Sequence, residues 1–216
     1  MRGPVNLANV ITVIRLFLAP LYVVAYALID ISPIAGGLET LIAVLWALFI
    51  VMEITDVLDG MVARRQNIVT DLGKVLDPFA DVVCRLTYFV ILTVAGIVPL
   101  WFVMIVLYRE LASVFLRLLF VREGIALGAG TAGKLKSWFY SVAAAAALFL
   151  FTADRLPGLP TRVGDALPAV RWAALAVYAI AAFLALWSIG GYIAYYARHR
   201  RGGSAGEPQN RGGSRA

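Results

Sequence analysis

The sequence predicts an all-α, polytopic integral membrane protein with six transmembrane helices. Of its 216 residues, 62% are hydrophobic and 15% are charged, and the mean hydropathy is +0.85, whereas soluble domains hold roughly 45–50% apolar residues. Runs of about twenty apolar residues recur along nearly the whole chain, and a helix needs about twenty residues to cross a hydrocarbon core of about 30 Å. Because the loops between these runs are short, we expect one membrane domain over residues 1–197.

The first half of the chain contains three of the expected helices. The run that begins at Val5 is not followed by a small-residue cleavage site, so we expect it to remain as a helix over 7–29 rather than to be a signal peptide. Pro33 marks a turn, after which helix 38–62 runs into an acidic segment. The third helix, over 76–96, begins at the end of the same acidic segment.

The second half contains the other three helices and a polar tail. Helix 99–120 is apolar apart from a few charges, and helix 134–153 follows after a short loop. A stretch rich in turn formers leads to the last helix, over 168–196. The residues over 198–216 are rich in Gly, Ser and Arg and have almost no apolar side chain to bury, so we expect a basic, disordered cytoplasmic tail.

The distribution of cations predicts the orientation of these helices. Few cations lie between the first and second or between the fifth and sixth helices, whereas many lie near the opposite helix ends and in the tail. By the positive-inside rule, both termini are expected in the cytoplasm, and a bacterial inner membrane suits so compact a chain. The net charge of +6 is explained by this bias, so we expect a lipid bilayer and no nucleic acid as partner.

Four aspartates lie at the ends of two otherwise apolar helices. Asp56 and Asp59 are three residues apart, and Asp77 and Asp81 are four apart, so each pair shares one helix face. Carboxylates at membrane depth cost at least a few kcal/mol each and repel one another. We therefore expect all four to bind a cation. Oxygen ligands without His or thiolate favour Mg²⁺, or Mn²⁺, over zinc.

Glycine and arginine residues near these aspartates favour a phosphate-bearing substrate. Gly60 follows Asp59, and Gly73 precedes Asp77 by four residues; the missing side chains allow a phosphate to approach the backbone. Arg64 offers a fork of donors for phosphate oxygens. The whole segment fits the pattern D-x-x-D-G-x-x-A-R-x8-G-x3-D-x3-D without a mismatch.

This pattern resembles the signature of the CDP-alcohol phosphotransferases, membrane enzymes of six helices that usually form homodimers. The resemblance implies that Asp56, Asp59 and Asp77 bind metal, that Asp81 lies beside the metal and accepts a proton, and that Gly60 and Arg64 hold the cytidine diphosphate of CDP-diacylglycerol. The resemblance also places Thr70 near the nucleotide, although a threonine in a loop also serves as a simple cap.

Further segments resemble the phosphatidylglycerophosphate synthases within this family. The segment NLANVITVIRLFLAPLY is similar to their first helix, and it implies that Asn9 and Thr12 contact CDP-diacylglycerol, with Arg15 nearby. The segments YRELASVFLR and TAGKLKS resemble the surroundings of the acceptor site in these synthases. The residues implied to bind the acceptor phosphate are Arg109, Arg117, Lys134 and Lys136.

The resemblance implies that metal neutralises the diphosphate, that the acceptor hydroxyl attacks the phosphorus carrying diacylglycerol, and that CMP leaves while Asp81 takes the proton. Glycerol 3-phosphate is the first choice of acceptor. These synthases usually carry Lys directly after the fourth aspartate, whereas Val82 stands here, so phosphatidylglycerol, serine and inositol phosphate stay open. A cation transporter is the remote alternative, because acids inside membranes also mark ion pathways. The acidic cluster occurs only once, without the repeats common in transporters.

Overall fold

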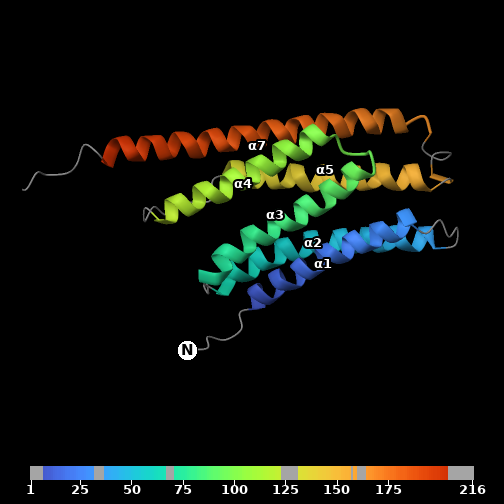
Figure 1. Cartoon of the computed structure of the whole chain (residues 1–216), viewed down its shortest axis with the longest axis horizontal. Helices are drawn as coiled ribbons and strands as arrows, with labels where there is room; N and C mark the ends of the chain where they lie inside the picture. Colours follow the sequence, from blue (N-terminus) through green and yellow to red (C-terminus); the bar gives the residue numbers. More distant parts are fainter. Residues whose placement is uncertain are drawn as a thin grey trace, which may run out of the picture.

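The computed structural model describes residues 7–31, 37–66, 71–122, 131–156, 158–159 and 164–203. Within these ranges the chain forms six long helices and no strand (Figure 1), which confirms the predicted all-α fold. The helices are α1 (Leu7–Ile31), α2 (Leu38–Gln66), α3 (Asp71–Val94), α4 (Leu100–Arg122), α5 (Thr131–Arg155) and α7 (Leu167–Gly203).

α3 and α7 extend furthest beyond the bounds that their apolar runs predict. α3 begins at Asp71 rather than at residue 76, and α7 ends at Gly203 rather than at residue 196. Both added segments contain charged residues and glycine, so a search for apolar runs does not include them. The rest of the predicted tail, residues 204–216, lies outside the described residues.

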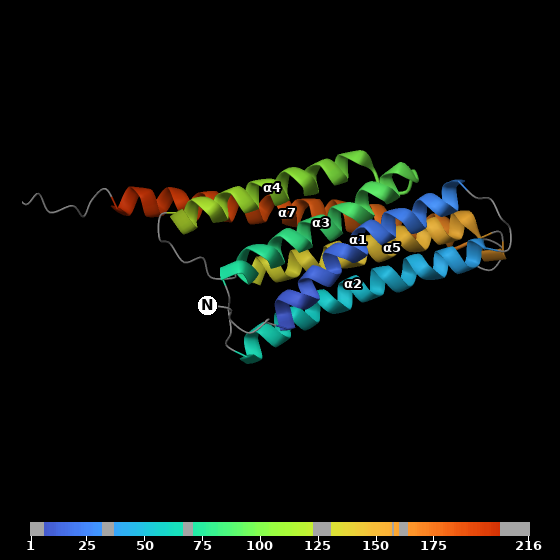
Figure 2. The ribbon, with the colours of Figure 1, turned by 60° about the horizontal axis from the view of Figure 1, so that its bottom comes forward.

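Successive helices run in opposite directions along one bundle (Figures 1 and 2). The first residue of α1, the last of α2 and the first of α3 therefore lie at the same end, which we call the N-terminal end. α1 packs against α2 and α3, and α7 packs against α4 and α5. α3 also contacts α4 and α5. α3 thus joins the two groups of helices, and it carries two of the four predicted aspartates.

A tight turn at the opposite end sets the angle between α3 and α4. Gly96 has φ of 78°, a left-handed conformation that glycine adopts without a Cβ penalty. The amide of Gly96 donates to the carbonyl of Thr93, and the amide of Ile97 donates to that of Leu92, each over 2.9 Å. This pair of bonds is the Schellman motif that ends a helix. Pro99 follows, and α4 begins at the next residue.

The core below the predicted site consists of aromatic and small side chains. Phe89, Phe102, Tyr140 and Tyr178, from four different helices, are buried and stacked with ring centroids 5.1 to 6.4 Å apart. Such pairs add to the free energy gained by burial alone. Alanines form the contact between α5 and α7, where small side chains let helices approach closely. The buried alanines of these two helices are Ala143, Ala144, Ala147, Ala153, Ala174, Ala181, Ala182 and Ala185.

The outer face of the bundle is apolar. Phe17, Leu21, Trp172 and Trp187 are among the large side chains that point outward, which is typical of a surface that faces lipid rather than water. The helices α1, α2, α5 and α7 are long and apolar enough to cross a membrane. α3 and α4 are interrupted by charged residues, and most of those whose side chains the structure describes are buried or half-buried.

The aromatic core yields a prediction about stability. Phe102→Ala removes a fully buried ring from the contact among α3, α4, α5 and α7, and it should lower the free energy of unfolding by about 3–5 kcal/mol. The matched control is Phe115→Ala on the same helix, because that ring is 61% exposed. Thermal unfolding in detergent should show a clear drop in the melting temperature for Phe102→Ala only. Equal drops for both variants would contradict the assigned core.

Candidate active site

Arg15 joins three helices at the N-terminal half of the bundle. Its side chain projects from α1 and is buried, with 1% of the residue exposed. Nη1 donates to Oδ1 of Asp56 on α2, and Nη2 lies 3.1 Å from Oδ1 of Asp81 on α3. The two aspartates, 25 positions apart in sequence, therefore converge on one guanidinium group. Their side chains keep 37% and 32% of their surface exposed.

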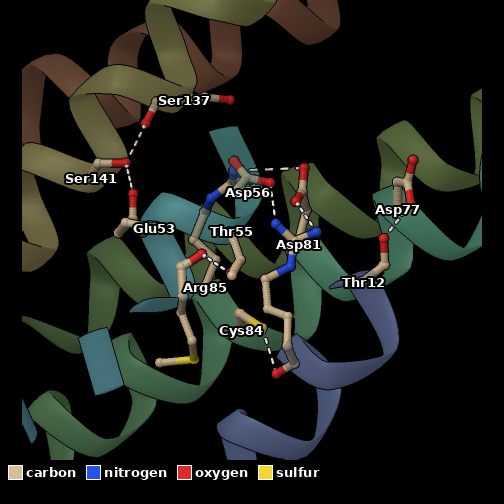
Figure 3. A network of polar contacts seen from close by, with 12 residues as sticks. Thr12, Glu53, Thr55, Asp56, Asp77, Asp81, Cys84, Arg85, Ser137 and Ser141 are labelled. Atoms are coloured by element: carbon tan, nitrogen blue, oxygen red, sulfur yellow. Dashed lines mark hydrogen bonds and ion pairs between the residues drawn. The ribbon is translucent and has the colours of Figure 1, made fainter. Parts of the chain in front are cut away.

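Asp77 is held one helical turn away from this contact. The hydroxyl of Thr12 donates to Oδ1 of Asp77 over 2.7 Å, and Thr12 is fully buried (Figure 3). Thr12 and Arg15 are three residues apart on α1, and Asp77 and Asp81 are four apart on α3, so each pair shares one face of its helix. The two faces meet, and both predicted aspartates of α3 are thereby contacted by α1.

The charges continue from Asp81 toward α4 and α7. Arg85 lies one turn further along α3, with Nη2 3.9 Å from Oδ2 of Asp81 and Nη1 3.7 Å from Oε1 of Glu110. Glu110 accepts a 2.8 Å hydrogen bond from Nη1 of Arg109, whose Nε and Nη2 donate to Ser188 of α7 over 3.2 and 3.0 Å. We call this series of alternating charges the buried charge chain; it consists of Asp56, Arg15, Asp81, Arg85, Glu110 and Arg109.

Glu53 is a further acidic residue that the sequence analysis did not assign to the site. Its carboxylate accepts a 2.9 Å hydrogen bond from the hydroxyl of Tyr88. It accepts another from the hydroxyl of Ser141, which Figure 3 shows. It thus joins α2 to α3 and α5. Glu53 lies three residues before Asp56 in an apolar helix, and Arg85 lies four residues after Asp81. The helical spacing of three or four residues that links the aspartates also links Glu53 to Asp56 and Arg85 to Asp81. The sequence therefore contained a signal that both residues lie on the same helix faces as the predicted site.

A small cavity of about 10 Å³ lies among these groups. Its lining includes Arg15, Glu53, Asp56, Asp81 and Arg85. A space of this size holds about one water molecule. A substrate as large as a nucleotide lipid therefore has to approach the exposed parts of Asp56 and Asp81 from outside this cavity.

Not all of the predicted site residues have described side chains. Asn9 lies on α1, three residues before Thr12. Several others lie on described helices, but their side chains are outside the described part; they are Asp59, Gly60 and Arg64 on α2, Gly73 on α3, Arg117 on α4, and Lys134 and Lys136 on α5. Thr70 lies outside the described residues altogether. Arg109, predicted to bind the acceptor phosphate, is buried against Glu110 and Ser188.

The donor set suits a hard divalent cation. Among the side chains that the structure describes, no three His, Cys, Asp or Glu residues gather closely enough to hold a metal ion. The carboxylates of Asp56 and Asp81 are nevertheless partly exposed, and Asp59 follows Asp56 by three residues on α2. Carboxylate oxygens without imidazole or thiolate are what Mg²⁺ and Mn²⁺ prefer. The residues therefore fit such an ion.

Comparisons with known proteins show the family to which the chain is related. A family model described as CDP-alcohol phosphatidyltransferase matches residues 5–187. A CDP-diacylglycerol–glycerol-3-phosphate 3-phosphatidyltransferase from Bacillus subtilis (strain 168) is 35% identical over 147 residues, which cover 66% of this chain and 76% of that protein. A probable phosphatidylglycerophosphate synthase from Mycobacterium tuberculosis (strain ATCC 25618 / H37Rv) is 34% identical over 64% of this chain and 63% of its own length.

A protein with a different named reaction matches over a shorter segment. A cardiolipin synthase (CMP-forming) from Streptomyces coelicolor (strain ATCC BAA-471 / A3(2) / M145) is 43% identical over 67 residues, which cover 30% of this chain and 31% of that protein. The match is thus closer in identity but covers less than half as much of the chain as the two synthase matches. It bears on which acceptor is used rather than on the type of reaction.

The contacts of Arg15 yield a prediction about stability and metal binding. Arg15→Met removes the guanidinium that compensates Asp56 and Asp81. The cost should be below the roughly 3–5 kcal/mol of a fully buried pair, because the two carboxylates are 37% and 32% exposed. We expect a lower melting temperature in metal-free buffer. Mg²⁺ should then raise the melting temperature of Arg15→Met more than that of the wild type, because a cation can replace the lost charge. Equal Mg²⁺ effects on both proteins would contradict this account.

Proposed function

The chain belongs to the CDP-alcohol phosphatidyltransferase family, and we propose that it transfers the phosphatidyl group of CDP-diacylglycerol to the hydroxyl of glycerol 3-phosphate, giving phosphatidylglycerophosphate and CMP. The observation that carries the proposal is the convergence of Asp56 and Asp81 on Arg15, with Asp77 one turn away. The named activities of the bacterial relatives support the choice of reaction and acceptor.

A divalent metal is the cofactor of this family, and we propose Mg²⁺, or alternatively Mn²⁺. Asp56, Asp59, Asp77 and Asp81 would hold it. When bound, the ion neutralises the diphosphate of CDP-diacylglycerol and so lowers the barrier to attack by an oxygen nucleophile. The hydrogen bond from Thr12 orients Asp77, and Arg15 keeps Asp56 and Asp81 close together before the ion arrives.

Asp81 is the proposed proton acceptor. Oδ1 of Asp81 faces Arg15 at 3.1 Å, and Oδ2 lies 3.9 Å from Nη2 of Arg85. A distance of 3.9 Å is too long for a hydrogen bond, so Oδ2 keeps lone pairs for a proton. The acceptor oxygen forms a bond to the phosphorus that carries diacylglycerol, the bond from this phosphorus to the CMP oxygen breaks, and the hydroxyl proton moves to Asp81.

The remaining assignments follow the family resemblance and the chain's charge distribution. We propose that CDP-diacylglycerol is held by Gly60, Arg64, Thr70, Gly73, Asn9 and Thr12, and the acceptor phosphate by Arg109, Arg117, Lys134 and Lys136. The protein is an integral membrane protein, and we propose a homodimer in a bacterial inner membrane with its active site and both termini on the cytoplasmic side. The many cations near the N-terminal end of the bundle support this orientation.

Phosphatidylglycerol is the second candidate acceptor. The specific observation in its favour is the 43% identity to a cardiolipin synthase over 67 residues. The longer matches, over 147 and 139 residues, are to proteins named for glycerol 3-phosphate transfer and phosphatidylglycerophosphate synthesis. We therefore rank glycerol 3-phosphate first.

CMP release tests the reaction and the acceptor together. Purified protein with CDP-diacylglycerol and Mg²⁺ should release CMP only when glycerol 3-phosphate is added, and mass spectrometry should identify phosphatidylglycerophosphate as the product. Chelation of the metal with EDTA should abolish release. Release with phosphatidylglycerol or serine, but not with glycerol 3-phosphate, would change the acceptor while keeping the family.

The role of Asp81 can be tested separately from folding. Asp81→Asn should lower kcat by about 10²–10⁴-fold, the usual contribution of a general base, because the amide cannot accept the proton. Asp154→Asn is the matched control, since Asp154 pairs with Arg171 at the opposite end of the bundle, and it should keep wild-type turnover. Near wild-type kcat in Asp81→Asn, with Mg²⁺ binding retained, would show that another group accepts the proton.

A further inference from the structure

Arg85 is a buried cation to which neither the reaction described above nor the family resemblance assigns a role. It lies on α3, four residues after Asp81, and 7% of the residue is exposed. Its guanidinium group lies over the ring of Tyr140, 5.4 Å from the ring centroid, and between the carboxylates of Asp81 and Glu110. The side chain is therefore fixed in place by an aromatic face and by charge on both sides.

The donors of Arg85 are not used in hydrogen bonds within the part of the chain that the structure describes. Its contacts with Asp81 and Glu110 measure 3.9 and 3.7 Å, beyond the 2.7–3.2 Å or so of an N–H···O hydrogen bond. In contrast, all three nitrogens of Arg109 donate over 2.8 to 3.2 Å. A guanidinium group carries five N–H donors, so Arg85 has donors to offer to a ligand.

Each carboxylate next to Arg85 has a closer cationic partner. Asp81 is 3.1 Å from Arg15, and Glu110 is 2.8 Å from Arg109. A divalent cation on the aspartates would take over the compensation of Asp81 as well. Arg85 then has charge and donors available for another anionic oxygen, and its side chain lines the cavity beside Asp56 and Asp81.

The position of Arg85 favours the acceptor over the nucleotide lipid. The residues proposed for CDP-diacylglycerol lie on α1, α2, the segment between α2 and α3, and the first turn of α3, whereas Arg85 lies on the other side of Asp81, toward α4 and α5. Four residues of helix span about 6 Å. If the acceptor hydroxyl gives its proton to Asp81, this hydroxyl lies next to Asp81. The phosphate of the acceptor, a few bonds away, can then lie next to Arg85.

We propose that Arg85 binds the phosphate of the acceptor and so helps to select a phosphorylated alcohol, with Glu110 as the residue that positions it. This inference rests on the proposed function. The chemistry recognised is a phosphate oxygen, which either the acceptor or the diphosphate of CDP-diacylglycerol could supply. The two sources are distinguished by which Michaelis constant changes when Arg85 is replaced.

The test compares Arg85→Gln and Arg85→Lys with the wild type and with Arg171→Gln, a control at the far end of the bundle. Arg85→Gln should raise KM for glycerol 3-phosphate about 10- to 100-fold, the effect of losing a charge-assisted hydrogen bond, with KM for CDP-diacylglycerol unchanged. Arg85→Lys keeps the positive charge, and it should raise KM for glycerol 3-phosphate by less. It also serves as the test variant if Arg85→Gln does not fold. Arg171→Gln should change neither constant.

A binding measurement provides a second readout without turnover. In detergent with Mg²⁺, inorganic phosphate should raise the melting temperature of the wild type, and this rise should be lost in Arg85→Gln. A higher KM for CDP-diacylglycerol instead, or a fall in kcat with both KM values and the phosphate-induced rise unchanged, would overturn the assignment. Failure of the wild type to release CMP with glycerol 3-phosphate would instead remove the proposed function, whereas comparing the phosphate-induced rise between the wild type and Arg85→Gln would still test whether Arg85 binds phosphate.

Discussion

The buried charge chain determines how the helices of this protein can pack. A guanidinium group inside an apolar bundle is stable only beside carboxylates, and the partners of Arg15 come from α2 and α3. Thr12 and Asp77 form a second contact between α1 and α3, one turn away. A shift of one residue in either helix would rotate these side chains by about 100° and break both contacts. The buried charge chain, together with the contact between Thr12 and Asp77, therefore selects a single register for α1, α2 and α3.

The same pairing suits the site proposed here for a metal and for phosphates within apolar helices. Without metal, the guanidinium groups of Arg15 and Arg85 lie among carboxylates that would otherwise repel one another. In the function proposed here, a divalent ion takes over the compensation of the carboxylates, and cationic donors become available for phosphate oxygens. The apolar surroundings strengthen each of these interactions because the local dielectric is low.

α3 connects this chemistry to the rest of the fold. Asp77, Asp81 and Arg85 lie on successive turns of α3, and one turn after Arg85 the helix buries Phe89 against rings of α4 and α5. The Schellman turn at Gly96 then sets the path into α4, which contributes Glu110 to the charge chain. The packing of Phe89 thus fixes the position of the charged residues on α3. Residues of α1, α2, α4 and α5 contact or adjoin these charges.

The sequence by itself determined the helical membrane fold, the six helices and the family, because apolar runs, turn formers and the spacing of Asp56, Asp59, Asp77 and Asp81 are local patterns. Division of the chain into a domain and a tail stays a prediction. Only the tertiary structure decided that Arg15 meets both Asp56 and Asp81, that Arg85 lies between Asp81 and Glu110, and that Glu53 reaches Ser141. Spacing along one helix shows which residues share a face, whereas partners on different helices depend on the rotation and register of each helix. Those are set by packing contacts between segments far apart in the chain.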